Sequence, residues 1–317
     1  METRRLSGVC RRILIIALCL LAVGACRSKP KEVTGSHSAP VPQEKADLIT
    51  ENPVPEPDPG TVKNQQPSYT DTSLIRRFQY AWADSLPKPP ILIVVDDFGY
   101  ATGSLLQGFA DLPPEVAFAI LPDLQYTQVA VEKANQYGHD IMIHVPMEAQ
   151  GASIRPGERY IKRGMSEEET LEMINAFYAQ MPAAIAANQH MGSTTTADPV
   201  LMRYVLRSLD KLGLVFLDSA TTTKLVSPAV ARELGIVSMI RDIFLDVPDN
   251  SDSTLVTKLK VLPRFSGRAE PIVIITHCHN RYKLEALQKF IAKVLEMGFE
   301  LISLSDALKR LPTRPPA

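Results

Sequence analysis

A five-residue apolar run that ends in two consecutive aspartates constrains the fold of this chain more than any other feature. Residues 91–95 read Ile-Leu-Ile-Val-Val, and Asp96 and Asp97 follow directly. A strand that is apolar at every position is buried on both faces, which is typical of a parallel sheet covered by helices. In such folds the carboxyl ends of the strands open on one face, where ligands bind. The run therefore predicts an α/β fold with polar side chains at one end of its strands.

The alternation of strand and helix continues to residue 304. Seven further strands are predicted, at 116–121, 140–145, 185–188, 214–217, 236–240, 272–275 and 300–304. Helices with readable ends lie between them; for example, Ser166 and Glu169 have the spacing of a capping box. Eight strands alternating with helices predict a distorted (β/α) barrel of seven or eight strands. A doubly wound open sheet is the alternative, but no glycine-rich phosphate loop follows the first strand.

The first 25 residues are typical of an export signal. Four arginines within residues 4–12 precede an apolar run from Ile13 to Ala25, which is shorter than the roughly 20 residues of a membrane span. Small residues precede Cys26, as in the lipobox of bacterial lipoproteins, so we expect cleavage after residue 25 and lipidation of Cys26. An ordinary signal with an incidental cysteine is the alternative. The expected location is the cell envelope, with the lipid on the periplasmic side of the outer or inner membrane.

Residues 26–88 are rich in proline and polar residues and show no sustained apolar periodicity. Eleven of the 25 prolines lie between positions 30 and 90. Such a composition cannot bury enough apolar surface to offset chain entropy, so we expect a disordered tether. A short helix within 73–85 is expected to dock on the folded domain, which is predicted to span 89–312. Because Cys278 is the only cysteine of that domain, no disulfide can form within it.

Aspartates and histidines gather where the predicted strands end. Asp97 follows the first strand, His144 and His190 lie at the ends of the third and fourth, and His277 ends the seventh. Two imidazoles and a carboxylate make an open site for Zn²⁺ or a similar divalent ion, which lowers the pKa of a bound water. The neighbouring Asp96 could then accept a proton while a third imidazole protonates a leaving group. This set of side chains suits hydrolysis of an amide or ester.

Alternation along a strand predicts how neighbouring side chains are oriented. Asp96 and Asp97 would point to opposite sides if the strand geometry persists, one toward a metal and one toward a proton. The same rule applied to residues 277–279 predicts that His277 alone is functional. Cys278 is then expected to be a small buried residue.

Five segments resemble, in order, the motifs of the divergent polysaccharide deacetylases. They are DDFGY at 96–100, HVPME at 144–148, NQHMGS at 188–193, FLDSATT at 216–222 and RDIFLD at 241–246. The resemblance covers about residues 90–307. It implies a distorted barrel and metal-dependent removal of acyl groups from a glycan such as peptidoglycan. It also implies that Asp96 is the general base, Asp97 a metal ligand and His277 the general acid.

The second motif departs from the pattern of typical polysaccharide deacetylases, which have two metal-binding histidines four residues apart. Here His144 is followed four residues later by Glu148. Either Glu148 binds the metal, or His190 supplies the missing nitrogen. We favour His190, because an imidazole preserves the ligand type. Glu148 would then form a hydrogen bond to one of the ligands.

Three further polar residues are candidates for the substrate groove. Arg241 and Asp242 could orient a catalytic carboxylate or the substrate, or form a structural ion pair at the barrel rim. Asp218 could line the groove, or it could cap the turn at residues 221–222.

Two functions of different classes fit these observations. The first is a metal-dependent hydrolase that removes acetyl groups from an envelope or extracellular polysaccharide. The second is a catalytically weak or inactive lipoprotein that uses the same barrel to bind a glycan or a partner. The presence of both Asp96 and His277 favours the enzyme, and the missing second imidazole favours the binder. With 34 basic and 35 acidic residues, the chain gives no electrostatic reason to expect nucleic acid.

Overall fold

The computed structural model describes residues 74–78, 86–151 and 155–311, all within one compact unit of the chain. The predicted signal segment 1–25, Cys26 and most of the predicted tether lie outside the described residues.

The short helix expected ahead of the barrel is present as α1 (Leu74–Arg77). Its Ile75 is buried, and the helix packs against α7 (Asp252–Leu259) and α8 (Arg281–Glu296). Among the helices that the structure describes, none combines the length and the apolar character needed to cross a membrane.

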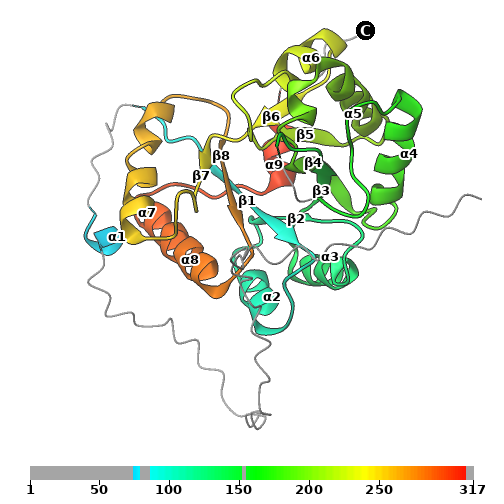
Figure 1. Cartoon of the computed structure of the whole chain (residues 1–317). Coiled ribbons are helices and arrows are strands. Elements are labelled where there is room, and N and C mark those ends of the chain that lie inside the picture. Colours follow the sequence, from blue (N-terminus) through cyan, green and yellow to red (C-terminus); the bar gives the residue numbers. More distant parts are fainter. Residues whose placement is uncertain (1–73, 79–85, 152–154, 312–317) are drawn as a thin grey trace, which may run out of the picture. The chain divides into compact units, whose positions relative to one another are not determined.

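Eight parallel strands form one sheet in the order β6-β5-β4-β3-β2-β1-β8-β7 (Figure 1). The strands are β1 (Ile91–Phe98), β2 (Ala117–Ile120), β3 (Ile141–Met147), β4 (Ala184–Met191), β5 (Val215–Asp218), β6 (Ser238–Ile240), β7 (Ile243–Phe244) and β8 (Ile272–His277). Because every pairing is parallel, all carboxyl ends of the strands lie at the same end of the sheet.

A single short segment closes this sheet into a barrel. β6 pairs with β5, and after Arg241 and Asp242 the chain pairs with β8 as β7. The amide of Arg241 donates to the carbonyl of Asp218 and that of Asp242 to the carbonyl of Val273, both at 2.9 Å. Since only two residues separate the edge strands, the two edges of the sheet must meet here. The distorted (β/α) barrel expected from the sequence is thus confirmed.

One predicted strand is wrong and one observed strand was not predicted. The segment 300–304 forms only an isolated bridge between Leu301 and Ile91 before the chain enters α9 (Leu304–Lys309). Strand β7 has only two residues, which is too short to produce a recognisable apolar pattern. The other seven predicted strands coincide with observed ones, within a few residues at their ends.

Helices surround the sheet (Figure 1). Besides α7 and α8, they are α2 (Gly103–Ala110), α3 (Thr127–Tyr137), α4 (Glu167–Tyr178), α5 (Pro199–Lys211) and α6 (Ser227–Leu234). Two 3₁₀ turns, at Thr195–Ala197 and Leu262–Phe265, complete the described elements. The capping box predicted at Ser166 and Glu169 is confirmed, because each side chain accepts a hydrogen bond from the amide of the other residue.

The interior of the barrel contains an apolar layer, followed by a polar layer toward the carboxyl ends of the strands. Its apolar layer includes Val94, Met142, Ala186 and Ile275, and α9 adds Leu304 and Ala307. The residues two positions later on the same four strands are Asp96, His144, Asn188 and His277. Because side chains two apart on a strand share a face, the packing of the apolar layer directs these four polar groups into the mouth of the barrel.

Candidate functional site

The end of β1 brings two carboxylates to the same side. Asp97 has a left-handed backbone conformation, with φ 70°, and the register of β1 against β2 shifts between Val95 and Phe98. As a result, His144 Nε2 lies 3.1 Å from Asp97 Oδ1 and 3.9 Å from Asp96 Oδ2. The expectation that Asp96 and Asp97 face opposite sides is wrong, because regular strand geometry does not persist through Asp97. Phe98 then returns to the core, where its ring stacks on Phe118 at 3.9 Å.

Left-handed backbone conformations mark several other strand ends. The non-glycine residues with positive φ are Asp97, Asp123, Met191 and Ala220, each at the carboxyl end of a strand or within three residues of it. Such conformations cost roughly 1–3 kcal/mol each and cluster at functional sites. Among the described residues, non-glycine left-handed backbone therefore gathers at the carboxyl ends of the strands.

Asp97, His144 and His190 bring three donor atoms together. Asp97 Oδ1 lies 2.9 Å from His190 Nδ1, and His190 Nδ1 lies 3.3 Å from His144 Nε2. Oδ1 is buried, and its contacts to the two imidazoles lack hydrogen-bond geometry, so it has no hydrogen-bond partner among the described residues. An orphaned carboxylate oxygen between two imidazole nitrogens is satisfied by a cation. The three side chains therefore fit a divalent metal ion.

Asn188 fixes the orientation of His144 and Asp96. His144 Nδ1 donates to Asn188 Oδ1 at 2.7 Å, and Asn188 Nδ2 donates to Asp96 Oδ1 at 2.7 Å. Because Nδ1 carries the proton, the lone pair of His144 is on Nε2, which points at Asp97. Asn188 has no assigned role in the sequence prediction. Its position two residues before His190, on the same face of β4, was the signal that could have identified it.

The pocket around these groups is strongly negative. Burial raises the pKa of Asp97, but its contacts with three imidazoles outweigh burial and hold that pKa well below its usual value. Burial lowers the pKa of His144, but Asp96 and Asp97 prevail and raise it to about 9. Burial raises the pKa of Asp96, with Asp97 adding to the effect and neighbouring imidazoles opposing it. The two buried carboxylates thus favour a cation, either a proton or a metal ion, next to His144 Nε2.

His277 lies on the other side of Asp96, which it faces across the β1–β8 pairing. Its Nδ1 donates to Asp246 Oδ2 at 2.9 Å, and Lys283 Nζ donates to the same oxygen at 2.6 Å. Burial lowers the pKa of His277, but the hydrogen bond and charge of Asp246 outweigh it and the pKa is raised. Burial opposes ionisation of Asp246, yet His277 and Lys283 lower its pKa to about 2. A protonated imidazole is therefore favoured beside Asp96.

Glu148 does not take the place expected for it. Its carboxylate accepts a hydrogen bond from the amide of Arg163 at 2.7 Å, and its backbone pairs with Ile161. β3 ends at Met147, so the next residue belongs to this loop pairing and not to the barrel interior. The predicted hydrogen bond from Glu148 to a ligand is wrong, because Asn188 makes that contact to His144.

Two of the three groove candidates lie outside the groove. Asp218 is fully buried and accepts hydrogen bonds from Ser227, Gln189 and the amide of Ala220, so it caps the turn after β5. Asp242 forms a two-pronged ion pair with Arg268 and accepts from the amide of Val273, four residues before His277. For both residues the contacts favour the structural alternative to groove lining, because their carboxylates hold strands and turns.

Arg241 lies closer to the site than Asp242. Its Nε and Nη2 donate to the carbonyls of Ser219 and Ala220, and its guanidinium lies 3.7 Å from the ring centroid of Phe244. Phe244 in turn stacks on His277, with ring centroids 5.7 Å apart. Arg241 therefore supports the side chain that packs on His277, and it does not pair with Asp242.

His279 is a site residue that the sequence prediction excluded. Its Nε2 contacts Asp97 Oδ2, and its ring stacks on His277 at 5.3 Å. Alternation turns only Cys278 away, because side chains two apart on a strand share a face, so the rule gave no ground for excluding His279. Cys278 is buried, as expected, and its amide donates to the carbonyl of Asp96 at 3.0 Å.

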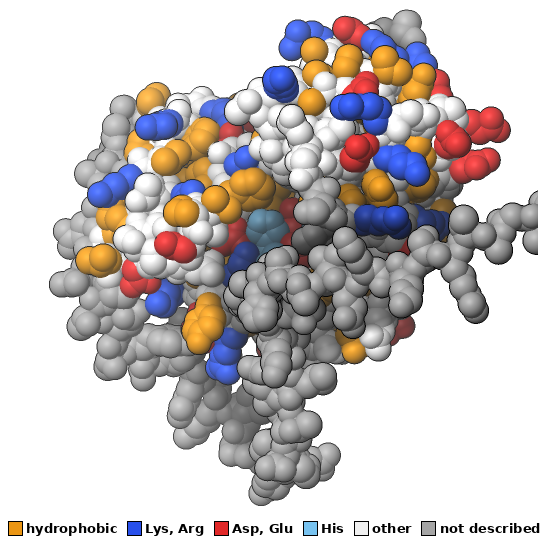
Figure 2. All heavy atoms as spheres, viewed as in Figure 1, with side chains coloured by type: hydrophobic (Ala, Val, Ile, Leu, Met, Phe, Trp, Pro, Cys, Tyr) orange, Lys and Arg blue, Asp and Glu red, His pale blue; other side chains and the backbone are white. Residues whose placement is uncertain are grey.

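The cluster opens to solvent on one side. Asp96, Asp97 and His144 are buried, whereas the side chains of His190 and His277 are each 22% exposed. Figure 2 shows histidine and carboxylate side chains at the bottom of a hollow between two raised parts of the surface. The histidine seen there belongs to this cluster, because the remaining described histidine, His139, is buried.

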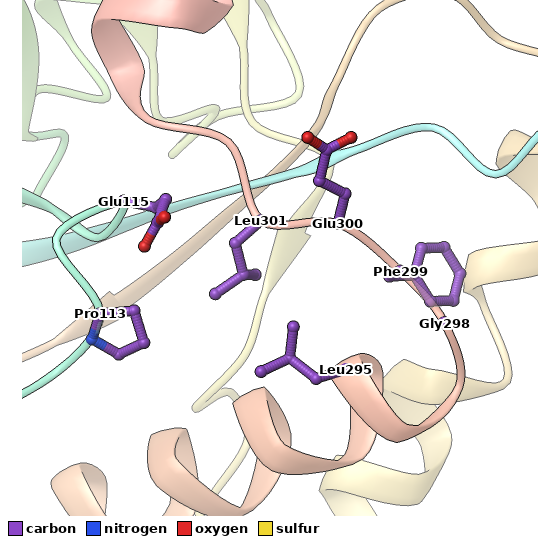
Figure 3. Close-up of a pocket in the computed structure, with 7 residues that line it drawn as sticks. All are labelled: Pro113, Glu115, Leu295, Gly298, Phe299, Glu300 and Leu301. Carbon is purple, nitrogen blue, oxygen red and sulfur yellow. The ribbon is translucent and has the colours of Figure 1, made fainter.

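A pocket of about 560 Å³ lies elsewhere on the barrel. Leu295 and Leu301 point toward one another in it, with Pro113 beside them (Figure 3). The carbonyl of Glu300, another lining residue, accepts a hydrogen bond from the amide of Ile91, at the start of β1. Asp97 is six residues further along that strand, which corresponds to about 20 Å. This pocket is therefore at the opposite end of the barrel from the histidine cluster.

The fold and the cluster together define an α/β barrel with aspartates, histidines and a metal-type donor set at the carboxyl ends of its strands. The family model described as divergent polysaccharide deacetylase matches residues 93–308. This chain belongs to that family, as the sequence resemblance indicated.

Two curated relatives and one solved structure are also similar to this chain. An uncharacterized protein of Haemophilus influenzae is 37% identical over 55% of this chain and 60% of its own length. The uncharacterized protein YibQ of Escherichia coli is 34% identical over half of each chain. The chain thus matches about half to three-fifths of the length of these relatives. The crystal structure of an uncharacterized protein from Agrobacterium tumefaciens has the same fold, with a TM-score of 0.63 and 21% identity over 73% of this chain and 94% of that one.

Proposed function

We propose that this chain is a metal-dependent hydrolase that removes acetyl groups from a polysaccharide of the cell envelope. The observation that carries the proposal is one hollow in which three donor atoms of Asp97, His144 and His190 converge, with Asp96 beside them and His277 facing Asp96 across the β1–β8 pairing. A protein that only binds a glycan needs neither a buried carboxylate of raised pKa nor an imidazole held protonated by Asp246. The family assignment supports the same reaction class.

Each residue has a task that its environment supports. Asp97, His144 and His190 would hold the cation, which when bound polarises an acyl carbonyl and lowers the pKa of water. Asp96, oriented by Asn188 and with its pKa raised by burial, accepts a proton from the attacking water. His277, kept protonated by Asp246, donates a proton to the leaving amine or alcohol.

We expect acetate release to depend on a divalent ion. The full-length chain should release acetate from N-acetylated chito-oligosaccharides or from peptidoglycan, lose this activity after treatment with a chelator, and recover it with Zn²⁺. Metal content measured in parallel should follow the activity. Binding of the glycans without acetate release, in a metal-loaded chain, would instead support the glycan-binding lipoprotein.

The pH dependence of turnover should follow the protonation of His277, and therefore depend on its partner Asp246. Because the general acid must be protonated, the rate falls as pH rises through the raised pKa of His277. Asp246→Asn removes the charge that raises this pKa, so the fall should begin at lower pH, by about one unit or more. Lys283→Met removes a cation that competes for Asp246 Oδ2, so it should move the fall to higher pH. If the profiles of kcat against pH coincide for the wild type and both variants, the proposed role of His277 as general acid is contradicted.

We also propose that the chain is exported and anchored through a lipid on Cys26. The proposal rests on the basic and apolar segments that precede a small-residue stretch ending in Cys26. Metabolic labelling with a fatty acid should mark the wild-type chain and fractionate it with membranes, whereas Cys26→Ser should be unlabelled. An unlabelled wild-type chain would leave an ordinary cleaved signal as the better explanation.

A further inference from the structure

Asp97 has a second contact that the donor set of the metal site does not require. Its Oδ1 faces His144 and His190, while its Oδ2 accepts a hydrogen bond from His279 Nε2. His279 stands outside the group of converging donor atoms, and its side chain is 47% exposed, far more than those of the other cluster histidines. Its contact with Asp97 joins the end of β8 to the end of β1.

The orientation of Asp97 needs such a contact. A carboxylate rotates easily about its last torsion, which is broad and roughly two-fold. Asp97 also has a left-handed backbone at a register shift, so strand pairing does not fix its side chain. Without a partner for Oδ2, both oxygens could turn toward a cation. With Oδ2 held, only Oδ1 is presented to it.

The geometry makes His279 a donor to Asp97 and not a ligand. Since Nε2 carries the proton that is donated to Oδ2, Nδ1 holds the lone pair on the opposite side of the ring. The ring is itself held by stacking on His277, which packs on Phe244. His279 therefore has a fixed plane in which to point its donor at Asp97.

We propose that His279 is a positioning residue that holds Asp97 Oδ2, so that Asp97 would offer only Oδ1 to a metal ion held with His144 and His190. The inference rests on the proposed metal-dependent function, and it adds a residue that lies in none of the five motifs. It also explains why the chain carries a second histidine just beyond His277.

The test compares Zn²⁺ affinity in three full-length chains, by competition with a chromogenic chelator. His279→Ala should bind Zn²⁺ about 10–100-fold more weakly than wild type, the usual effect of losing a hydrogen bond to a metal ligand. His279→Gln should retain most of the affinity, because its Nε2 reaches a similar distance and can donate to Oδ2. His279→Asn, one methylene shorter, replaces the alanine variant if that chain does not fold.

Cobalt absorption separates positioning from ligation. At saturating Co²⁺, His279→Ala should show weaker visible bands than wild type, because a freed Oδ2 lets Asp97 bind through both oxygens and raises the coordination number. His279→Gln, whose amide nitrogen can donate a hydrogen bond but cannot bind a metal ion, should keep the wild-type bands. Equal Zn²⁺ affinity in wild type and His279→Ala, or cobalt spectra that coincide for these two chains, would overturn the inference while leaving the proposed function intact. A wild-type chain that binds neither ion would overturn both.

Discussion

Replacing His190 with alanine will abolish stoichiometric metal binding and lower acetate release by about a thousandfold. His190 Nδ1 lies 2.9 Å from the orphaned Asp97 Oδ1 and 3.3 Å from His144 Nε2, so its removal takes away one of only three converging donors. Metal assistance is worth several kcal/mol of transition-state stabilisation, and each 1.36 kcal/mol corresponds to about tenfold in rate. Elemental analysis and acetate release, measured on the same preparation, test both parts of this expectation.

Glu148→Gln is the matched control for His190→Ala. The two residues are the alternatives that the sequence offers for the third ligand, and the structure places the carboxylate of Glu148 on the amide of Arg163. Glutamine keeps a hydrogen-bond acceptor there, so metal content and rate should stay within about twofold of wild type. The reverse pattern, with loss in Glu148→Gln and retention in His190→Ala, would show that Glu148 moves into the site when metal binds.

The regular part of this fold was predictable, since it rests on strand periodicity. The run at 91–95 is buried at every position and pairs with β2 and β8 on its two sides. The same alternation explains why Asp96, His144, Asn188 and His277 enter the barrel above an apolar layer. Placing polar residues at strand ends was therefore enough to anticipate that Asp96, His144 and His277 lie together, although Asn188 had no assigned role.

What could not be predicted lies where the backbone leaves strand geometry. Alternation placed the side chain of Asp97 on the wrong face of β1. The left-handed backbone of Asp97, at the register shift, turns this side chain toward the same site as that of Asp96. His279 was excluded although side chains two apart on a strand share a face, and it stacks on His277 just beyond the end of β8. Asp218 was a candidate because it ends a strand, and Glu148 because it lies four residues after His144, yet local amides and hydroxyls occupy their carboxylates. Hydrogen-bond partners of this kind depend on loops whose conformation periodicity does not encode.

Asp96→Asn should separate metal binding from proton transfer. Asp96 lies 3.9 Å from His144 Nε2 but is outside the three converging donors, so the variant should still hold one metal ion per chain at saturating metal. Asparagine has the same shape and can still accept from Asn188 Nδ2, but it cannot take a proton from water. Loss of a general base lowers turnover by about 10²–10⁴-fold.

The control for Asp96→Asn is the same change at the end of the neighbouring strand. Asp123 follows β2, and its carboxylate is held by Arg159 Nε at 2.8 Å and Gln180 Nε2 at 2.9 Å, so it makes no contact with the metal-type donors. Asp123→Asn should therefore cost stability but leave kcat near the wild-type value at a temperature where the chain is folded. Full turnover in Asp96→Asn would show that another group accepts the proton. Loss of metal from Asp96→Asn would instead place Asp96 among the ligands, and the buried carboxylate pair would then act as a cation site with no base beside it.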